Sequence, residues 1–209
     1  MMFISFEGID GSGKSTQLVI LRELLEERGH TVVTIREPGA TLLSESIREI
    51  LLSTKQTITP TAELLLFSAA RTQLVEKVIE PALQQGSIIL CDRYVDSTTA
   101  YQGYGRKLDL ESVQLCNRMA TRGVMPTVTF FIDVAFEQAQ QRMQFNPGAG
   151  EPDRMERSGR DFFERVRDGY LAIAAEEPGR FVVINGLRER SEIHEEIVST
   201  LQRRSSLFA

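Results

Sequence analysis

A glycine-rich segment near the start of the chain has the residues needed to hold a nucleoside triphosphate. Gly8 is followed by four residues and then by Gly13, Lys14 and Ser15, between a mainly apolar run at 3–6 and a helical pattern. Glycine lets backbone N–H groups converge on an anion at the start of a helix. Lys14 can reach the β- and γ-phosphates, and the Ser15 hydroxyl can join a Mg²⁺ shell. A glycine-rich turn that binds nothing is the alternative.

Asp92 and Arg93 directly follow an apolar run at 87–91. In phosphate-loop proteins an acid at the end of such a strand commonly orients Mg²⁺ or its waters. An arginine at the mouth of a triphosphate site can clamp a transferring phosphoryl group. The alternatives are that Asp92 caps the next turn or pairs with Arg93, and that Arg93 pairs with Asp92 or Asp96.

Arginines and aromatic residues indicate a second ligand beside the triphosphate. Phe67 and Arg71 are four residues apart, so they project from one face of a helix and could stack on a base and bond its edge. Tyr101 and Gln102 suggest the same from a predicted loop. A core phenylalanine with a surface arginine, or a solvated face, would explain each residue singly. The arginines expected at the same rim suggest a second phosphorylated substrate; they are Arg36, Arg48, Arg71 and Arg106.

The elements that position these residues alternate between strands and helices. Helices are expected over 14–28, 41–52, 59–85, 109–122, 136–145, 161–175 and 191–204, with Pro81 kinking or dividing the third. Strands are expected over 3–7, 31–35, 87–91, 127–132 and 181–184. This order predicts an α/β three-layer sandwich around a five-stranded parallel sheet. Ligands are then expected beyond the carboxyl ends of the strands.

Composition narrows the class of protein. The chain has 209 residues, 42% of them hydrophobic and 25% charged, which predicts one globular domain over 1–209. A net charge of -5 without a basic run argues against nucleic acid as the main partner. Two cysteines and no signal-like start indicate a cytoplasmic protein, and no apolar stretch is long enough to span a membrane.

The polar segment 146–153 is expected to be a lid, extending to about 157.

Several short segments together form a recognisable pattern; they are 6–16, 36–39, 69–71, 92–94, 100–103 with Arg106, and 153–154 with Glu156. With these segments in this order, the chain resembles bacterial thymidylate kinases across nearly its whole length. The resemblance implies a nucleoside monophosphate kinase fold, ATP as phosphoryl donor, Mg²⁺, dTMP as acceptor, and a homodimer in the cytoplasm. A kinase for another nucleoside monophosphate such as dUMP is one alternative. A non-catalytic nucleotide-binding switch is another, although the chain lacks the Asn-Lys-x-Asp element of guanine-specific switches.

The resemblance also assigns roles to individual positions. It implies that Phe67 stacks on thymine, that Arg71 bonds its edge and that Tyr101 lies against the deoxyribose. The donor side would comprise Gly8, Ile9, Asp10, Gly11, Ser12, Gly13, Lys14, Ser15, Thr16, Arg142, Asn185 and Gly186. The acceptor side would comprise Glu37, Pro38, Arg48, Phe67, Arg71, Arg93, Thr98, Tyr101 and Gln102, with Asp10 also lining it. The catalytic residues would be Lys14, Arg93, Asp10 and Arg154, and the metal ligands Ser15 and Asp92.

The chain departs from the family pattern in two places. Position 40 is alanine where the family commonly has a second glycine, so the turn there is expected to be less free. One branch of the family carries a basic residue within the phosphate loop, and other members supply lid arginines instead. Neither the loop between Gly8 and Gly13 nor the segment 146–152 contains a basic residue. The edges of the lid offer Arg142, Arg154, Arg157 and Arg160.

Overall fold

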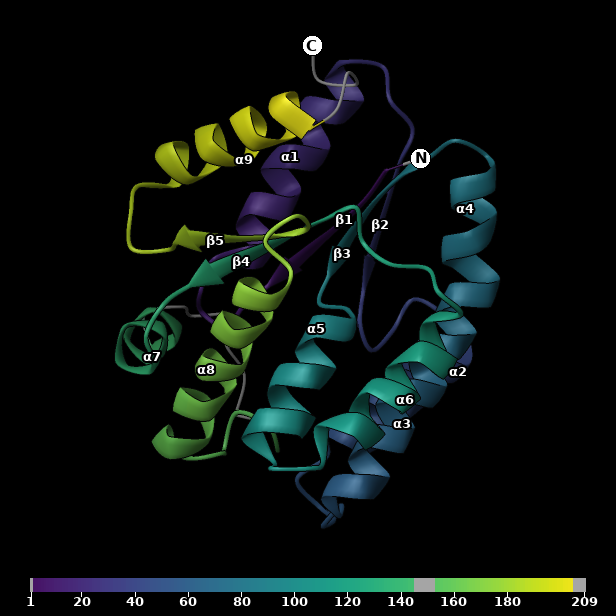
Figure 1. The fold of residues 1–209 in the computed structure, drawn as a ribbon, viewed down its shortest axis with the longest axis vertical. Coiled ribbons are helices and arrows are strands. Elements are labelled where there is room, and N and C mark those ends of the chain that lie inside the picture. The colour runs from purple at the N-terminus through teal and green to yellow at the C-terminus, as the bar shows by residue number, and fades with distance from the viewer. Residues whose placement is uncertain (1, 145–152, 205–209) are drawn as a thin grey trace.

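The centre of the molecule is a five-stranded parallel sheet with the strand order β2-β3-β1-β4-β5 (Figure 1). The computed structural model describes residues 2–144 and 153–204. The strands are β1 (Met2–Glu7), β2 (Val32–Arg36), β3 (Ile88–Asp92), β4 (Val128–Asp133) and β5 (Phe181–Asn185). In the register, Ser5 of the central strand lies beside Cys91 on one side and Thr129 on the other. The predicted α/β fold with a five-stranded parallel sheet is confirmed.

Helices cover both faces of the sheet (Figure 1). On one face, Ile4 and Phe6 of β1 pack with Leu21 of α1 and Ile197 of α9. On the other face, the alternate residue Phe3 packs with Leu74. This alternation follows from the period of two in a strand. The helical elements are α1 (Lys14–Glu27), α2 (Leu42–Leu52), α3 (Pro60–Leu74), η1 (Val75–Ile79), α4 (Glu80–Gln84), α5 (Val95–Thr98), η2 (Thr99–Gly105), α6 (Leu110–Thr121), α7 (Phe136–Gln144), α8 (Arg160–Glu176) and α9 (Arg190–Arg204).

The long helix predicted over 59–85 is divided, as expected from Pro81. It runs through α3 and then widens into the π-helical segment η1 before α4 begins at Glu80. Proline has no N–H to donate and its ring clashes with the carbonyl four residues earlier. A π-helical turn directly before Pro81 lets the chain pass this point without ending the helix.

The prediction of a loop after Asp92–Tyr94 is wrong, because residues 95–105 form α5 and the π-helical segment η2. Gly103 and Gly105 favour a turn when only the sequence is considered. In the structure a Cβ on Gly105 would lie 2.7 Å from the Phe162 ring, and one on Gly103 would lie 2.7 Å from Leu110. These glycines therefore permit close packing of η2 against α8 and α6, and tertiary contact overrides their local preference.

Ala40 lies in the turn between β2 and α2 and has a positive φ of 66°. Its backbone N–H donates a hydrogen bond of 2.8 Å to Glu45 Oε1. A left-handed conformation costs a residue with a Cβ about 1–2 kcal/mol. Ala40 thus adopts a strained backbone conformation that the glycine commonly found at this position in the family would adopt without strain.

Ala40→Gly is expected to raise the free energy of unfolding by about 0.5 kcal/mol, because relief of the left-handed strain outweighs the added freedom of the unfolded chain. Urea denaturation would show this as a higher midpoint with an unchanged slope. Ala172→Gly, inside α8, is the matched control and is expected to lower stability by about 1 kcal/mol. A lower midpoint for Ala40→Gly would contradict the prediction.

Candidate active site

The phosphate loop lies between β1 and α1 and forms one side of an open cavity of about 470 Å³. Lys14 is 4% exposed, and its Nζ donates to Ile9 O at 3.1 Å and lies 3.5 Å from Asp10 Oδ1. Gly13, at the start of α1, has a φ of 104°. The cavity is lined by Asp10, Gly11, Ser12, Gly13, Lys14, Ser15, Thr16, Gln17, Ile132, Arg142, Gly186, Arg188, Arg190 and Ile193.

Close backbone contacts explain two of the glycines in this loop. A Cβ on Gly8 would lie 2.7 Å from Ile132 O, and one on Gly11 would lie 2.5 Å from Ala139 O. Both glycines also have positive φ angles. Any larger residue at either position would push the loop away from the sheet or from α7.

Most of the predicted donor-side residues line this cavity, and three of them do not. Arg142 donates to Ser12 O at 3.2 Å and to Gly186 O at 2.8 Å, so it bridges the loop and the end of β5. Gly8 and Ile9 are absent from the lining, and Ile9 is buried in a core cluster. Asn185 is exposed, and its Oδ1 accepts a hydrogen bond from Leu187 N instead.

Ser15 and Asp92 meet at the end of β3, where Ser15 Oγ donates to Asp92 Oδ2 at 2.6 Å. Hydroxyl and carboxylate oxygens are the ligands that Mg²⁺ prefers. Within residues 2–144 and 153–204, no three His, Cys, Asp or Glu residues group into a metal site. This pair therefore fits a cation that takes one or two protein oxygens and completes its shell with phosphate and water.

A second, smaller cavity of about 100 Å³ adjoins the first. It is lined by all nine residues predicted for the acceptor side, so the structure brings this set together. Sequence reasoning missed some of its walls, because a leucine, methionine or serine carries no chemical signal in a linear pattern. Asp10 also lines this cavity, as the resemblance implied, and the additional lining residues are Leu52, Tyr94, Ser97, Asp153 and Met155.

Arg71 is 1% exposed and is held by a buried carboxylate at the edge of this smaller cavity. Its Nε donates to Glu37 Oε2 at 2.8 Å, and its Nη2 lies 2.6 Å from the same oxygen. Nη1 donates to Asn117 Oδ1 at 3.1 Å, and Nη2 donates to Thr98 Oγ1 at 2.9 Å. A guanidinium with this many partners has one orientation, which fixes the donors that it presents to the cavity.

Asp10 lines both cavities and lies where they meet. Arg93 Nη2 lies 2.9 Å from Asp10 Oδ1, and the Arg93 Cζ lies 5.1 Å from the centroid of the Tyr101 ring. Burial acts to raise the pKa of Asp10, but the charges of Arg93 and Lys14 outweigh it and hold the pKa well below its usual value. Arg93 has a φ of 71°, a strained conformation of the kind found at functional sites. The junction is thus one ionised carboxylate between two cations.

The structure does not bring Arg154 to the phosphate loop. Its Nη1 lies 2.6 Å from Glu63 Oε2, its Nε donates to Leu51 O at 2.8 Å, and it lines neither cavity. Arg106 also binds Glu63, at 3.1 Å. Arg36, another residue expected at the rim, pairs with Glu45 and lines neither cavity.

Part of the predicted lid can be placed. Residues 146–152 lie outside the described residues. Asp153 follows them and begins a turn, in which its Oδ1 accepts hydrogen bonds from Met155 N at 2.7 Å and Glu156 N at 2.8 Å. Asp153 and Met155 form part of the wall of the smaller cavity. The C-terminal edge of the predicted lid is therefore placed beside the acceptor-side residues.

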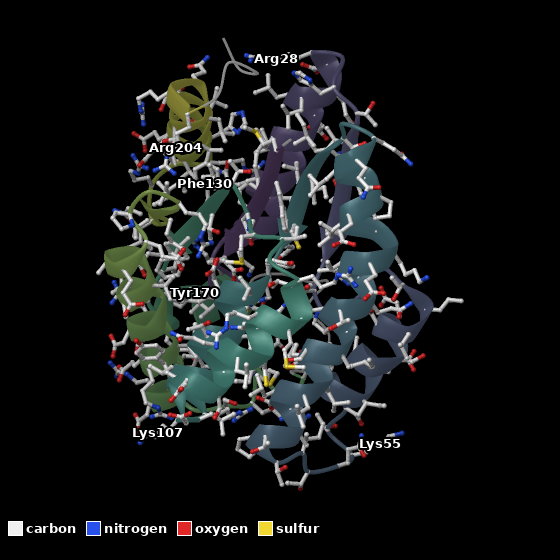
Figure 2. All side chains as sticks on the ribbon, turned by 45° about the vertical axis from the view of Figure 1, so that its right-hand side comes forward. Arg28, Lys55, Lys107, Phe130, Tyr170 and Arg204 are labelled. Carbon is white, nitrogen blue, oxygen red and sulfur yellow. The ribbon has the colours of Figure 1, made fainter. Side chains whose placement is uncertain are left out.

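Glu7 is a fully buried carboxylate at the end of β1 that sequence reasoning did not single out. It accepts hydrogen bonds from Tyr94 N at 2.7 Å, from Ser97 Oγ at 2.5 Å and from the Tyr170 hydroxyl at 2.9 Å. Figure 2 shows Tyr170 inside the molecule, whereas Lys107 lies at its edge. Burial raises the pKa of Glu7 to about 7, and the nearby charge of Asp96 adds to this.

Comparison with known proteins places the chain among thymidylate kinases. The sequence model of the family described as thymidylate kinase matches residues 6–197. Curated thymidylate kinases from Prosthecochloris aestuarii and Chlorobaculum tepidum are 51% and 50% identical, covering 99% and 96% of this chain and 96% of each relative. A crystal structure of thymidylate kinase from Ehrlichia chaffeensis is 40% identical, with a TM-score of 0.78 over 96% of this chain and 98% of that chain.

Glu7→Gln is expected to change how stability depends on pH. Between the unfolded pKa near 4.5 and the folded pKa of about 7, the native state holds a proton that the unfolded chain has released. The contribution of Glu7 to the free energy of unfolding of the wild type therefore falls as pH rises through this window. The variant lacks this loss. The difference between its free energy of unfolding and that of the wild type should therefore shift in favour of the variant by on the order of 3 kcal/mol between about pH 5 and about pH 8.

Denaturant unfolding at a series of pH values would measure this difference. Glu111→Gln, at the exposed start of α6, removes the same charge without touching a buried network and serves as control. The prediction fails if the stability difference between Glu7→Gln and the wild type stays constant across the window.

Proposed function

The chain belongs to the thymidylate kinase family, and from this premise we propose that one of its two cavities binds the phosphoryl donor and the other binds the acceptor. The enzyme transfers the γ-phosphoryl group of ATP to dTMP, which gives dTDP and ADP. One observation supports the division most directly: the two cavities meet at Asp10, beside Lys14 and Arg93. A donor and an acceptor phosphate bound on either side of that junction would lie next to each other.

The larger cavity is the proposed ATP site. The backbone N–H groups of the phosphate loop and the start of α1 bind the phosphates, because their dipoles point at the anion. Lys14 supplies a positive charge at the same place. Arg142 spans the outer rim between Ser12 and Gly186, where the base of the nucleotide would lie.

The smaller cavity is the proposed dTMP site. Phe67 offers an aromatic face for the thymine ring, and Arg71 offers guanidinium donors for its edge. Arg48, whose Nη1 donates to Pro38 O at 3.1 Å, and Arg93 hold the acceptor phosphate. Tyr101 lies against the deoxyribose and leaves little room for a 2′-hydroxyl.

Charge neutralisation and alignment carry the catalysis, because phosphoryl transfer needs little covalent help from the protein. Lys14 and Arg93 flank the position of the transferring group, and Asp10 holds both cations in place. Mg²⁺ held through Ser15 and Asp92 would supply further positive charge to the phosphates. Arg154, a catalytic candidate from the resemblance, is assigned instead a structural role as the ion-pair partner of Glu63 behind the acceptor cavity.

A coupled ADP-release assay tests this function against its alternatives. With ATP as donor, dTMP is expected to give far more turnover than dUMP, dCMP, AMP or GMP. Preferred turnover of dUMP would instead favour a different monophosphate kinase. Nucleotide binding without ADP formation on addition of dTMP would favour a switch.

Lys14→Ala and Arg93→Ala are each expected to lower kcat by about a hundredfold or more, since one preorganised charge contact is worth about 3 kcal/mol in the barrier. Circular dichroism should show that the fold is retained. Lys77→Ala, which removes an exposed lysine of η1, is expected to keep the wild-type kcat. Wild-type kcat in either site variant would contradict the roles proposed for these residues.

We propose that the protein acts as a homodimer through the face formed by α2, α3 and α6, which lie side by side in Figure 1. Large apolar side chains are exposed on this face, and Leu42 and Met119 are 93% and 71% exposed. A patch of this kind on neighbouring helices suits a two-fold contact, in which the same surface meets itself. The exposed large apolar residues of these three helices are Leu42, Leu43, Ile50, Leu65, Leu110, Leu115 and Met119.

Leu115→Glu is expected to shift the dimer toward monomer, because it places a charge in the apolar contact. Sedimentation velocity at several protein concentrations measures the shift. Leu171→Glu, the same change on α8, is the control and should leave the oligomeric state unaltered. A monomeric wild type at micromolar concentration would overturn the proposal.

A cytoplasmic location fits the chemistry of the chain. Cys91 and Cys116 are both free, and Cys91 is buried. No helix within residues 2–144 and 153–204 combines the length and apolarity needed to cross a bilayer. From the family to which the chain belongs, we propose that it supplies dTDP for nucleotide biosynthesis in the cytoplasm.

A further inference from the structure

Glu63 is a buried carboxylate beneath the acceptor cavity whose contacts determine how a neighbouring amide is oriented. It projects from α3 and is fully buried. Arg106 Nε donates to its Oε1 at 3.1 Å, and Arg154 Nη1 lies 2.6 Å from its Oε2. Gln102 Nε2 donates to its Oε1 at 2.9 Å. The carboxylate is thus surrounded by three donors from two other segments of the chain, η2 with its C-terminal Arg106 and the segment around Arg154.

The contact with Glu63 fixes which end of the Gln102 amide faces the cavity. An ionised carboxylate only accepts hydrogen bonds, so the amide must turn its NH₂ group toward Glu63. Although burial opposes ionisation, hydrogen bonds from Arg106, Gln102 and Arg154 keep the pKa of Glu63 below its usual value. Gln102 lines the cavity and is 1% exposed. Its Oε1, which meets no donor among the described residues, is the end left for a ligand.

Arg71 gives the same cavity a donor of fixed position. Its Nη1 carries two N–H bonds, and one of them donates to Asn117 Oδ1. The other meets no acceptor in the described part of the chain. The cavity therefore presents an N–H from Arg71 and an acceptor oxygen from Gln102.

We propose that Glu63 is a positioning residue that makes the enzyme reject dCMP by holding the Gln102 amide with its oxygen toward the base. Thymine carries a carbonyl at C4 and an N–H at N3, which match one donor and one acceptor. Cytosine carries an amino group at C4 and a lone pair at N3, so both contacts would be mismatched. A buried mismatch of this kind leaves polar groups unpaired and is costly. The inference rests on the proposed assignment of thymine to this cavity.

Glu63→Gln tests the proposal because a glutamine at 63 can either accept or donate, which frees the Gln102 amide to rotate. The measurement is kcat/KM for dTMP and for dCMP, each with ATP. The ratio of the two is expected to fall at least about tenfold, through a loss for dTMP and a gain for dCMP. Equal losses for both substrates, with an unchanged ratio, would show that Glu63 is merely structural and would overturn the proposal.

The double variant Glu63→Gln with Gln102→Glu provides a rescue that conserves charge. A carboxylate at 102 can only accept, so it again presents an oxygen to the base while the new amide at 63 donates to it. The dTMP/dCMP ratio is expected to return toward the wild-type value. If Glu63→Gln alone does not fold, the double variant tests the proposal by itself. A folded double variant that does not prefer dTMP over dCMP would overturn the proposal.

Two further measurements separate this inference from the function on which it rests. Glu164→Gln, the same change in an exposed ion pair on α8, should leave both kcat/KM values unaltered. A wild type that phosphorylates dTMP and dCMP equally well would overturn the role of Glu63 while leaving dTMP kinase activity intact. A wild type inactive on dTMP would contradict the assigned function itself.

Discussion

The geometry of the site depends on how the end of β1 is bonded to the segment that follows β3. Arg93 N donates to Phe6 O at 2.9 Å, and Tyr94 N donates to Glu7 at 2.7 Å. The first bond extends the parallel backbone pairing of the two strands past Asp92, and the second joins the Tyr94 backbone to the Glu7 side-chain carboxylate. Because the phosphate loop begins one residue after Glu7, the same contacts set the distance between Lys14 and Arg93. The Asp10–Arg93 ion pair then closes the junction between the two cavities.

Two buried carboxylates, one in the wall of the acceptor cavity and one behind it, hold arginines and an amide in place. Glu37 orients Arg71, and Glu63 gathers Gln102, Arg106 and Arg154. Buried ion pairs add little net stability, but removing one partner typically costs about 3–5 kcal/mol because it strands the other charge. These pairs therefore act mainly on orientation: Arg71 and Gln102, which line the cavity, each have a buried carboxylate as a partner.

The strands and their polar carboxyl ends were predictable because both depend on local pattern. Apolar runs that end in a polar or glycine residue identify a buried parallel strand and its carboxyl end. Phe67 and Arg71 were predictable as a pair because helical spacing places them on one face. Residues 95–105 were not, since the glycines that suggest a loop are there for packing against Phe162 and Leu110. Nor was Glu7, because nothing in the sequence shows that Tyr170 lies beside it.

The sequence by itself determined the alternating α/β order, the phosphate loop and the residue types of a two-nucleotide site. Those features follow from the spacing of residues along the chain, and the resemblance to thymidylate kinases identifies them. Only the tertiary structure decided the partners: Arg93 pairs with Asp10, and Arg154 turns to Glu63 and not to the phosphate loop. The physical reason is that a charged side chain binds whichever opposite charge the fold brings within reach. Such neighbours come from segments far apart in sequence, and no local pattern records them.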